Sequence, residues 1–185
     1  DGVEVLYEMA DERLRKFADD LLPLDAHKAA TDRLYVSTTH AQEKTNIIWS
    51  SFESRDSLLN CLLASCYIPL FAGSGKSPPL IGDEEFIDGG FTNNLPRFDE
   101  CGTLTISPFC SNADICPTDL TLFDWTMSLG RQHMKVSWYN ALRGAHTLFP
   151  PKRSVLEDYY KLGYVNTMSY LMDRNWFERD FGTEV

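Results

Sequence analysis

The sequence predicts a layered α/β domain, because short segments rich in β-branched and aromatic residues alternate with amphipathic segments along its 185 residues. A chain of this length suffices for one domain with a core and is too short for two. Hydrophobic residues make up 43% of the chain and charged residues 24%, as in ordinary globular proteins. The net charge of -10 argues against a nucleic-acid partner, which requires clustered positive charge.

The first quarter of the chain predicts one helix and two strands. Apolar residues recur at helical spacing over 3–22, where Pro23 ends the pattern. β-branched and aromatic residues predict strands over 33–39 and 45–52, joined by a turn.

The middle of the chain predicts a capped helix followed by two further strands. Ser54 is a suitable N-cap for a helix over 55–66. Residues 84–87 predict a short strand that leads into Asp88, and residues 103–107 predict another strand.

The last third of the chain predicts a helical region. Helices are expected over 128–147 and 153–174, separated by Pro150 and Pro151. This region is rich in aromatic side chains, which favours either a patch that contacts lipid or a helical cap that packs on the sheet.

The cysteines predict neither a metal site nor a disulfide framework. Their number is odd and no CxxC pair occurs. We expect five reduced thiols in a cytosolic protein. The five are Cys61, Cys66, Cys101, Cys110 and Cys116.

The strongest local motif is a strand that ends in Asp88, Gly89 and Gly90. The two glycines permit backbone conformations closed to other residues, so the turn can present a carboxylate at the edge of a sheet. A carboxylate held in this way can act as a general base. The alternative is an ordinary Asp-Gly hairpin turn without a catalytic role.

The blocks around this motif give it a wider context. In order along the chain, they are Cys66–Pro69, Pro78-Pro79, Phe86–Gly90, Asn93–Pro96, Ile106–Phe109, Asp114–Pro117, Leu148–Pro151 and Gly163-Tyr164. Their order and spacing resemble the second half of the patatin-like phospholipase family, in particular its triglyceride-lipase and adiponutrin branch.

The resemblance implies a three-layer α/β/α domain with a central, mostly parallel sheet, present only in part. Residues 1–110 correspond to the carboxy-terminal half of that domain, and residues 111–185 to a helical extension. The family uses a serine–aspartate pair, and its D-G-G motif maps onto Asp88, Gly89 and Gly90. This chain contains no GxSxG nucleophile motif and no run of three glycines for an oxyanion hole. We therefore expect the nucleophilic serine in sequence upstream of Asp1.

The function implied by the resemblance is that of a triacylglycerol lipase in lipid-droplet triglyceride breakdown. The expected substrate is a neutral glycerolipid or phospholipid ester, and no cofactor or metal is expected. Further expected partners are a lipid-droplet or membrane surface and a protein co-activator. The expected location is cytoplasmic and peripheral at such surfaces. A first alternative is a catalytically inactive protein that binds a lipid surface or a lipase, and a second is a fragment of a conventional α/β-hydrolase.

The histidines and asparagines give weaker signals. A conventional triad would use a histidine after the aspartate, such as His133 or His146. Both fall in predicted helices without a fixed relation to Asp88, so we expect them, like His27 and His40, to be surface or core residues. Asn93 and Asn94 follow the glycines, and we expect them to brace the turn.

Overall fold

The protein forms two compact units in the computed structural model. The first comprises Asp1–Pro96 with Leu129–Arg131, and the second comprises Arg97–Ser128 with Gln132–Val185. The structure describes residue 13 and residues 15–69, 77–98, 100–120, 125–130 and 132–176. The boundary at residue 110 expected from the sequence stays a prediction.

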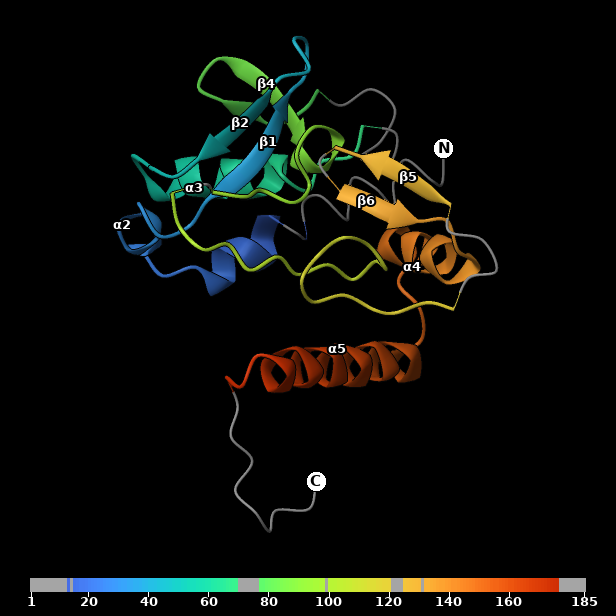
Figure 1. The fold of residues 1–185 in the computed structure, drawn as a ribbon. Coiled ribbons are helices and arrows are strands. Elements are labelled where there is room, and N and C mark those ends of the chain that lie inside the picture. The colour runs from blue at the N-terminus through green and yellow to red at the C-terminus, as the bar shows by residue number, and fades with distance from the viewer. Residues whose placement is uncertain are drawn as a thin grey trace. The chain divides into compact units, whose positions relative to one another are not determined.

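A small sheet is the centre of the first unit (Figure 1). Its strands run in the order β2-β1-β4-β3, and each neighbouring pair is antiparallel. The strands are β1 (Val36–His40), β2 (Asn46–Trp49), β3 (Leu80–Ile81) and β4 (Glu84–Asp88). The α/β class is confirmed, whereas the pairing direction in the described residues differs from the mostly parallel sheet that was expected.

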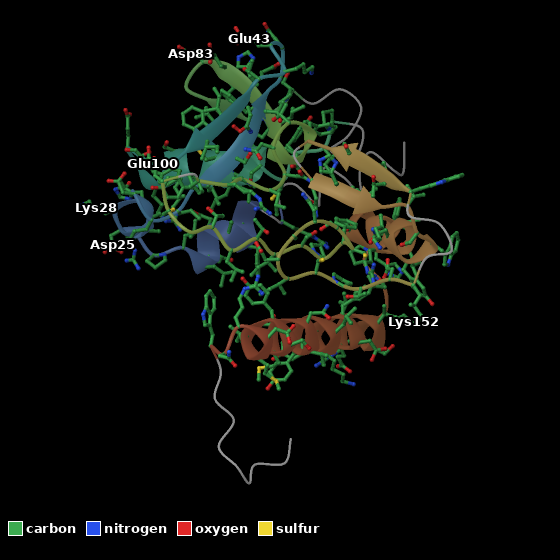
Figure 2. The ribbon with its side chains drawn as sticks, viewed as in Figure 1. Asp25, Lys28, Glu43, Asp83, Glu100 and Lys152 are labelled. Carbon is green, nitrogen blue, oxygen red and sulfur yellow. The ribbon has the colours of Figure 1, made fainter. Side chains whose placement is uncertain are left out.

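Short turns explain the antiparallel pairing of β1 with β2 and of β3 with β4. Residues 41–45 join β1 to β2, and Gly82 with Asp83 joins β3 to β4. Connections this short can only reverse the chain, since parallel neighbours require a crossover. Gly82 adopts a φ of +65°, which glycine tolerates without strain. Both turns project from the same end of the sheet, where Figure 2 labels Glu43 and Asp83, and β4 runs from there to Asp88 at its other end.

The helix α3 (Arg55–Ala64) packs on the sheet of this unit, and α2 (Ala26–Ala30) packs against α3. The predicted cap of α3 is confirmed, because Ser54 Oγ accepts a hydrogen bond from the Ser57 amide at 3.0 Å. Of the helix predicted over 3–22, residue 13 and residues 15–21 are helical, whereas residues 1–12 and 14 lie outside the described part of the chain. The short α2 was not predicted.

The core of the first unit joins α3 to β1. Its cluster includes Val36, Phe52, Leu58 and Cys61. Burial raises the pKa of the Cys61 thiol to about 11, so this side chain behaves as an apolar core group. All five cysteines are free.

The second unit contains two helices and nearly all of a two-stranded sheet, since Leu129–Arg131 is assigned to the first unit. The strands are β5 (Thr126–Leu129) and β6 (Gln132–Lys135), and the helices are α4 (Trp138–Leu148) and α5 (Arg153–Asp173). The prediction of α5 is confirmed. The prediction of one helix over 128–147 was wrong in its first half, where Gly130 has a φ of +56° and the chain turns between β5 and β6.

The strand predicted over 103–107 was also wrong. The structure has only an isolated bridge between Ile106 and Ile115 there. Pro108 lacks the amide needed to continue a ladder, which limits the pairing of this segment. None of the helices in the described ranges is long and apolar enough to cross a bilayer.

A buried ion pair stabilises the second unit. The Arg143 guanidinium donates to Asp119 Oδ1 at 2.8 Å and to Oδ2 at 2.9 Å. Ser137 Oγ donates to Asp119 Oδ2 at 2.6 Å. Burial alone would raise the pKa of Asp119, but the hydrogen bonds from Arg143 and Ser137 outweigh it and the pKa is lowered.

The variant Asp119→Asn is expected to destabilise the protein by about 3 kcal/mol at neutral pH, because a buried guanidinium loses its counter-charge. The loss is expected to shrink in acid. Because the pKa of Asp119 is lowered in the folded protein, its charge stabilises the fold at pH values above the ordinary aspartate pKa. This stabilisation is lost as the pH falls through the folded-state pKa. Urea denaturation at several pH values measures both effects. Asp158→Asn, at an exposed ion pair, is the control and should change stability little; an equal loss in both variants would contradict the prediction.

Candidate active site

Asp88 is the last residue of β4, and its backbone is fixed on two sides. Its amide donates to the carbonyl of Tyr67 at 3.0 Å. Its carbonyl accepts a hydrogen bond from Thr39 Oγ1 at 2.9 Å. The carboxylate therefore starts from a rigid strand end rather than from a loop.

The Asp88 carboxylate caps the turn that follows it. Its Oδ1 accepts a hydrogen bond from the Gly90 amide at 2.6 Å, at the start of the 3-10 turn η1 (Gly89–Phe91). Within the described residues this is the one hydrogen bond of the carboxylate, so Oδ2 is open to another partner. Burial raises the pKa of Asp88, and the bond from Gly90 opposes this only in part. The side chain is thus a fixed carboxylate that is more basic than an ordinary aspartate.

Close contacts rather than backbone angles constrain the two glycines, and the constraint is stricter at Gly89, whose neighbour is backbone, than at Gly90, whose neighbour is a side-chain oxygen. A Cβ on Gly89 would lie 2.3 Å from the backbone oxygen of Ser37 in the adjacent strand. A Cβ on Gly90 would lie 2.9 Å from Asp88 Oδ1. Neither glycine has a positive φ, so the requirement is steric and comes from the neighbours.

A partly buried polar network holds the turn against β1 and β2. Ser37 Oγ donates to the carbonyl of Asn93 at 2.8 Å and accepts from Asn46 Nδ2 at 2.8 Å. Asn93 Nδ2 donates to Asn46 Oδ1 at 3.2 Å, which closes the ring. Thr39 Oγ1 and Thr92 Oγ1 are 2.8 Å apart beside it. Asn93 thus braces the turn as expected, although it does so through Asn46.

A hollow of about 420 Å³ lies beside this network, lined by Thr39, Ile68, Ile87, Phe91 and Thr92 among others. Side chains of successive strand residues point to opposite faces, so Ile87 and Asp88 lie on different faces of β4. The hollow is therefore not a pocket around the Asp88 carboxylate.

No histidine or serine side chain among the described residues hydrogen-bonds to the Asp88 carboxylate, and the hydroxyl of nearby Ser37 bonds to Asn93 and Asn46 instead. His133 lies in β6 rather than in the predicted helix, and its Nδ1 is 2.9 Å from Ser128 Oγ. His146 lies in α4, and its Nδ1 is 2.8 Å from Tyr159 Oη. Both belong to the second unit, whereas Asp88 belongs to the first.

The other two histidines, His40 and His27, lie in the first unit. His40, at the end of β1, accepts a hydrogen bond from the Glu43 amide at 3.0 Å and packs edge-on against Phe86. His27 lies in α2. The described residues contain no group of three or more His, Cys, Asp or Glu side chains that could hold a metal ion.

The sequence did not reveal the supporting roles of Ser37, Asn46 and Thr92. Their partners are 9 to 56 positions away along the chain. The consecutive hydroxyls of Ser37, Thr38 and Thr39 in a predicted strand were the only available signal, since a buried strand rarely carries so many polar side chains.

Comparison with known proteins identifies the class. A family model described as patatin-like phospholipase matches residues 3–99, which is more than half of the chain, and it includes Asp88, Gly89 and Gly90. The chain belongs to the patatin-like phospholipase family.

Individual relatives give a finer picture. The chain is 39% identical over 166 residues to patatin-like phospholipase domain-containing protein 4 of Homo sapiens, covering 90% of this chain and 65% of that protein. It is 36% identical to the omega-hydroxyceramide transacylase of Mus musculus, covering 89% of this chain and 27% of that protein. It is 32% identical to patatin-like phospholipase domain-containing protein 2 of Homo sapiens, covering 90% of this chain and 32% of that protein. The chain thus spans less than two thirds of each of these relatives. No solved structure matches it.

The variant Gly89→Ala is expected to lower the free energy of unfolding by about 3 kcal/mol, because its Cβ would force β4 away from Ser37. Gly102→Ala is the matched control, since an added Cβ there has nothing within 4 Å. Urea denaturation measures both. If the two variants are equally stable, the contact between Gly89 and Ser37 does not constrain the turn.

Removing the Asp88 carboxylate is expected to change how stability depends on pH. Because the folded-state pKa is raised, the folded protein binds more protons than the unfolded chain above about pH 4. The stability of the wild type relative to Asp88→Asn should therefore fall as the pH rises above that value, and level off above the raised pKa. Chemical denaturation over this pH range measures the difference, and a rise with pH would refute the assignment.

Proposed function

We propose that this chain supplies the base of a serine–aspartate dyad in a lipid acyl hydrolase, with Asp88 as that base. The observation that carries the proposal is the state of the Asp88 carboxylate. It is half-buried and its pKa is raised. The Gly90 amide binds one of its oxygens, and the other has no hydrogen-bond partner among the described residues. In this proposal the serine comes from sequence outside this chain.

The chemistry follows from the weakness of a serine hydroxyl as a nucleophile. Asp88 would accept the hydroxyl proton while the serine oxygen bonds to the carbonyl carbon of an ester. The ester's C–O bond then breaks, and the alcohol leaves with the proton that Asp88 held. The raised pKa supports this role, because a more basic carboxylate is the better acceptor near neutral pH.

The acyl-enzyme can be released in two ways. Attack by water gives a free acid, whereas attack by a second alcohol gives a new ester. One relative is named as a transacylase and two as patatin-like phospholipase domain proteins, so the family names include both outcomes. We propose hydrolysis as the principal reaction and acyl transfer to an alcohol as a reaction of the same intermediate.

The proposed substrate is a neutral glycerolipid, with triacylglycerol first and phospholipid esters second. The net charge of -10 supports this order, because an acidic protein is repelled by anionic lipid. A neutral lipid surface, such as a lipid droplet in the cytoplasm, is the proposed place of action. A protein co-activator at that surface is part of the same proposal.

The test is the variant Asp88→Asn in the longer protein that carries the upstream sequence. The amide keeps the size of the side chain and removes the base, so kcat for a neutral acylglycerol should fall by about 100-fold or more. Asp83→Asn is the matched control, because Asp83 is an exposed acid at the opposite end of the same hairpin (Figure 2). It should leave kcat unchanged.

Two further measurements separate the alternatives. Circular dichroism must show that Asp88→Asn folds, since Asp88 also caps η1. Unchanged hydrolysis by a folded Asp88→Asn variant would refute the role of Asp88. If the wild type binds neutral lipid emulsions but hydrolyses no ester, the protein is the inactive lipid-binding member considered from the sequence.

A further inference from the structure

A second cavity lies within the second unit. It has a volume of about 630 Å³, within the usual range for small-molecule sites. The cavity is open to solvent, because Tyr160 and Tyr164 in its lining remain 76% and 51% exposed, and a ligand that covered them would bury apolar surface.

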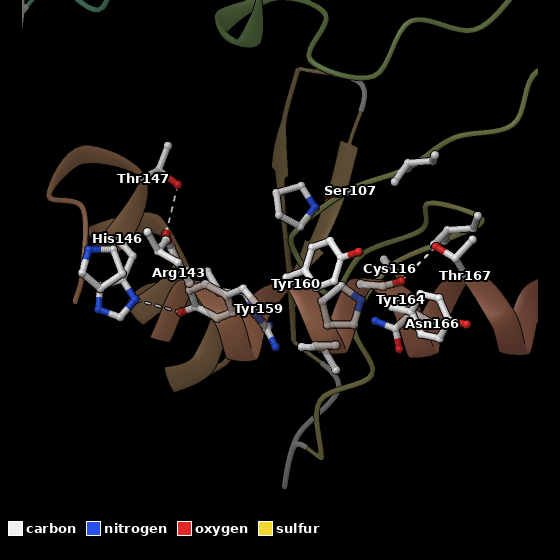
Figure 3. Close-up of a pocket in the computed structure, with 18 residues that line it drawn as sticks. Ser107, Cys116, Arg143, His146, Thr147, Tyr159, Tyr160, Tyr164, Asn166 and Thr167 are labelled. Carbon is white, nitrogen blue, oxygen red and sulfur yellow. Dashed lines mark hydrogen bonds between the residues drawn. The ribbon is translucent and has the colours of Figure 1, made fainter. Parts of the chain in front are cut away.

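One face of α5 forms a wall of this cavity (Figure 3). Leu156, Tyr159, Tyr160, Gly163, Tyr164 and Thr167 line it at the spacing of a single helical face. From Leu156 to Thr167 this face extends about 17 Å along the helix axis. The facing walls come from residues 106–108 and 115–117 and from α4. The cavity is therefore long enough for an extended chain.

The chemistry of the walls selects an uncharged ligand. Proline, isoleucine, leucine and tyrosine side chains make up most of the lining, and no carboxylate is among the lining residues. The one lining guanidinium, that of Arg143, is already paired with both oxygens of Asp119. An anionic headgroup would thus find no free counter-charge among the described lining residues.

One polar pair lies at an end of the cavity. His146 Nδ1 and Tyr159 Oη are 2.8 Å apart, and Figure 3 shows them together with Arg143 and Thr147 at one side of Tyr160. A phenol hydroxyl both donates and accepts, and an imidazole has a second ring nitrogen, so the pair can still bind a hydroxyl or an ester oxygen.

Gly163 widens the cavity along α5. It lies within α5, where glycine is among the least helix-favouring residues. Its φ is not positive, and an added Cβ would have nothing within 4 Å. Neither backbone conformation nor close packing requires glycine there. Its effect is to leave the middle of the cavity wall without a side chain.

From these observations we infer that the cavity between α4, α5 and the segment 106–117 binds one chain of an uncharged lipid, with its hydroxyl or ester oxygen at His146 and Tyr159. The inference is independent of the proposed role of Asp88. Asp88→Asn is therefore expected to bind the same ligand with unchanged affinity, and failure of one proposal leaves the other intact.

The experiment measures the binding of 1-decanol and of decanoate by isothermal titration calorimetry to the protein carrying the full chain. These probes share one chain length and differ in the charge of the head. Saturable binding of 1-decanol, about tenfold or more tighter than that of decanoate, is expected. No saturable binding of 1-decanol would overturn the site, and equal or tighter binding of decanoate would overturn the assignment to uncharged lipids.

Two variants test the location. Gly163→Leu places a side chain in the cavity, directed toward the preceding turn with Tyr159 and Tyr160, and should weaken 1-decanol binding by about tenfold or more. Thr167→Leu fills the space one turn further on and should also weaken it. Gly144→Leu is the matched control, because Gly144 lies in α4 outside the lining and an added Cβ there also has nothing within 4 Å. Unchanged binding in both cavity variants, or an equal loss in the control, would overturn the proposal.

Discussion

The close contact between Gly89 and the backbone of Ser37 is the constraint on which the candidate active site depends. A hydrogen atom is the only substituent that fits between the turn and β1, since any Cβ would lie 2.3 Å from the Ser37 oxygen. This contact lets Ser37 Oγ reach the carbonyl of Asn93, and it sets the direction in which β4 ends. The position of the Asp88 carboxylate is thus decided by a neighbouring strand rather than by the motif alone.

The Asp88 side chain has a structural role and a proposed chemical role at once. Its Oδ1 satisfies an amide at the beginning of η1, as capping carboxylates commonly do. The other oxygen carries the proposed function. Burial and capping act on its pKa in opposite directions, and burial is the larger effect. A fold can therefore fix a carboxylate firmly without making it a weaker base.

Local patterns predicted those parts of the fold that local interactions decide. Ser54 and the apolar spacing after it predicted α3, and the segment after Pro151 predicted α5. Asp88 was found at a strand end as expected, because two glycines after a strand mark a turn. The hairpin of β5 and β6 was not predicted, because its residues also fit a helical pattern. The turn depends on the positive φ of Gly130, which the sequence alone does not show. The ring of Ser37, Asn46 and Asn93 could not be predicted, because it joins residues up to 56 positions apart.

The buried thiol of Cys61 has a consequence for observing this site. The thiolate is the form that reacts with alkylating reagents, and a pKa of about 11 together with burial keeps Cys61 unreactive while α3 stays on the sheet. Cys66, just past the end of α3, is exposed and is therefore accessible to such a reagent while α3 stays in place. The next residue is Tyr67, whose carbonyl holds the amide of Asp88. Once Cys66 has been labelled, the rate at which Cys61 is modified therefore reports how often α3 detaches from the sheet next to Asp88.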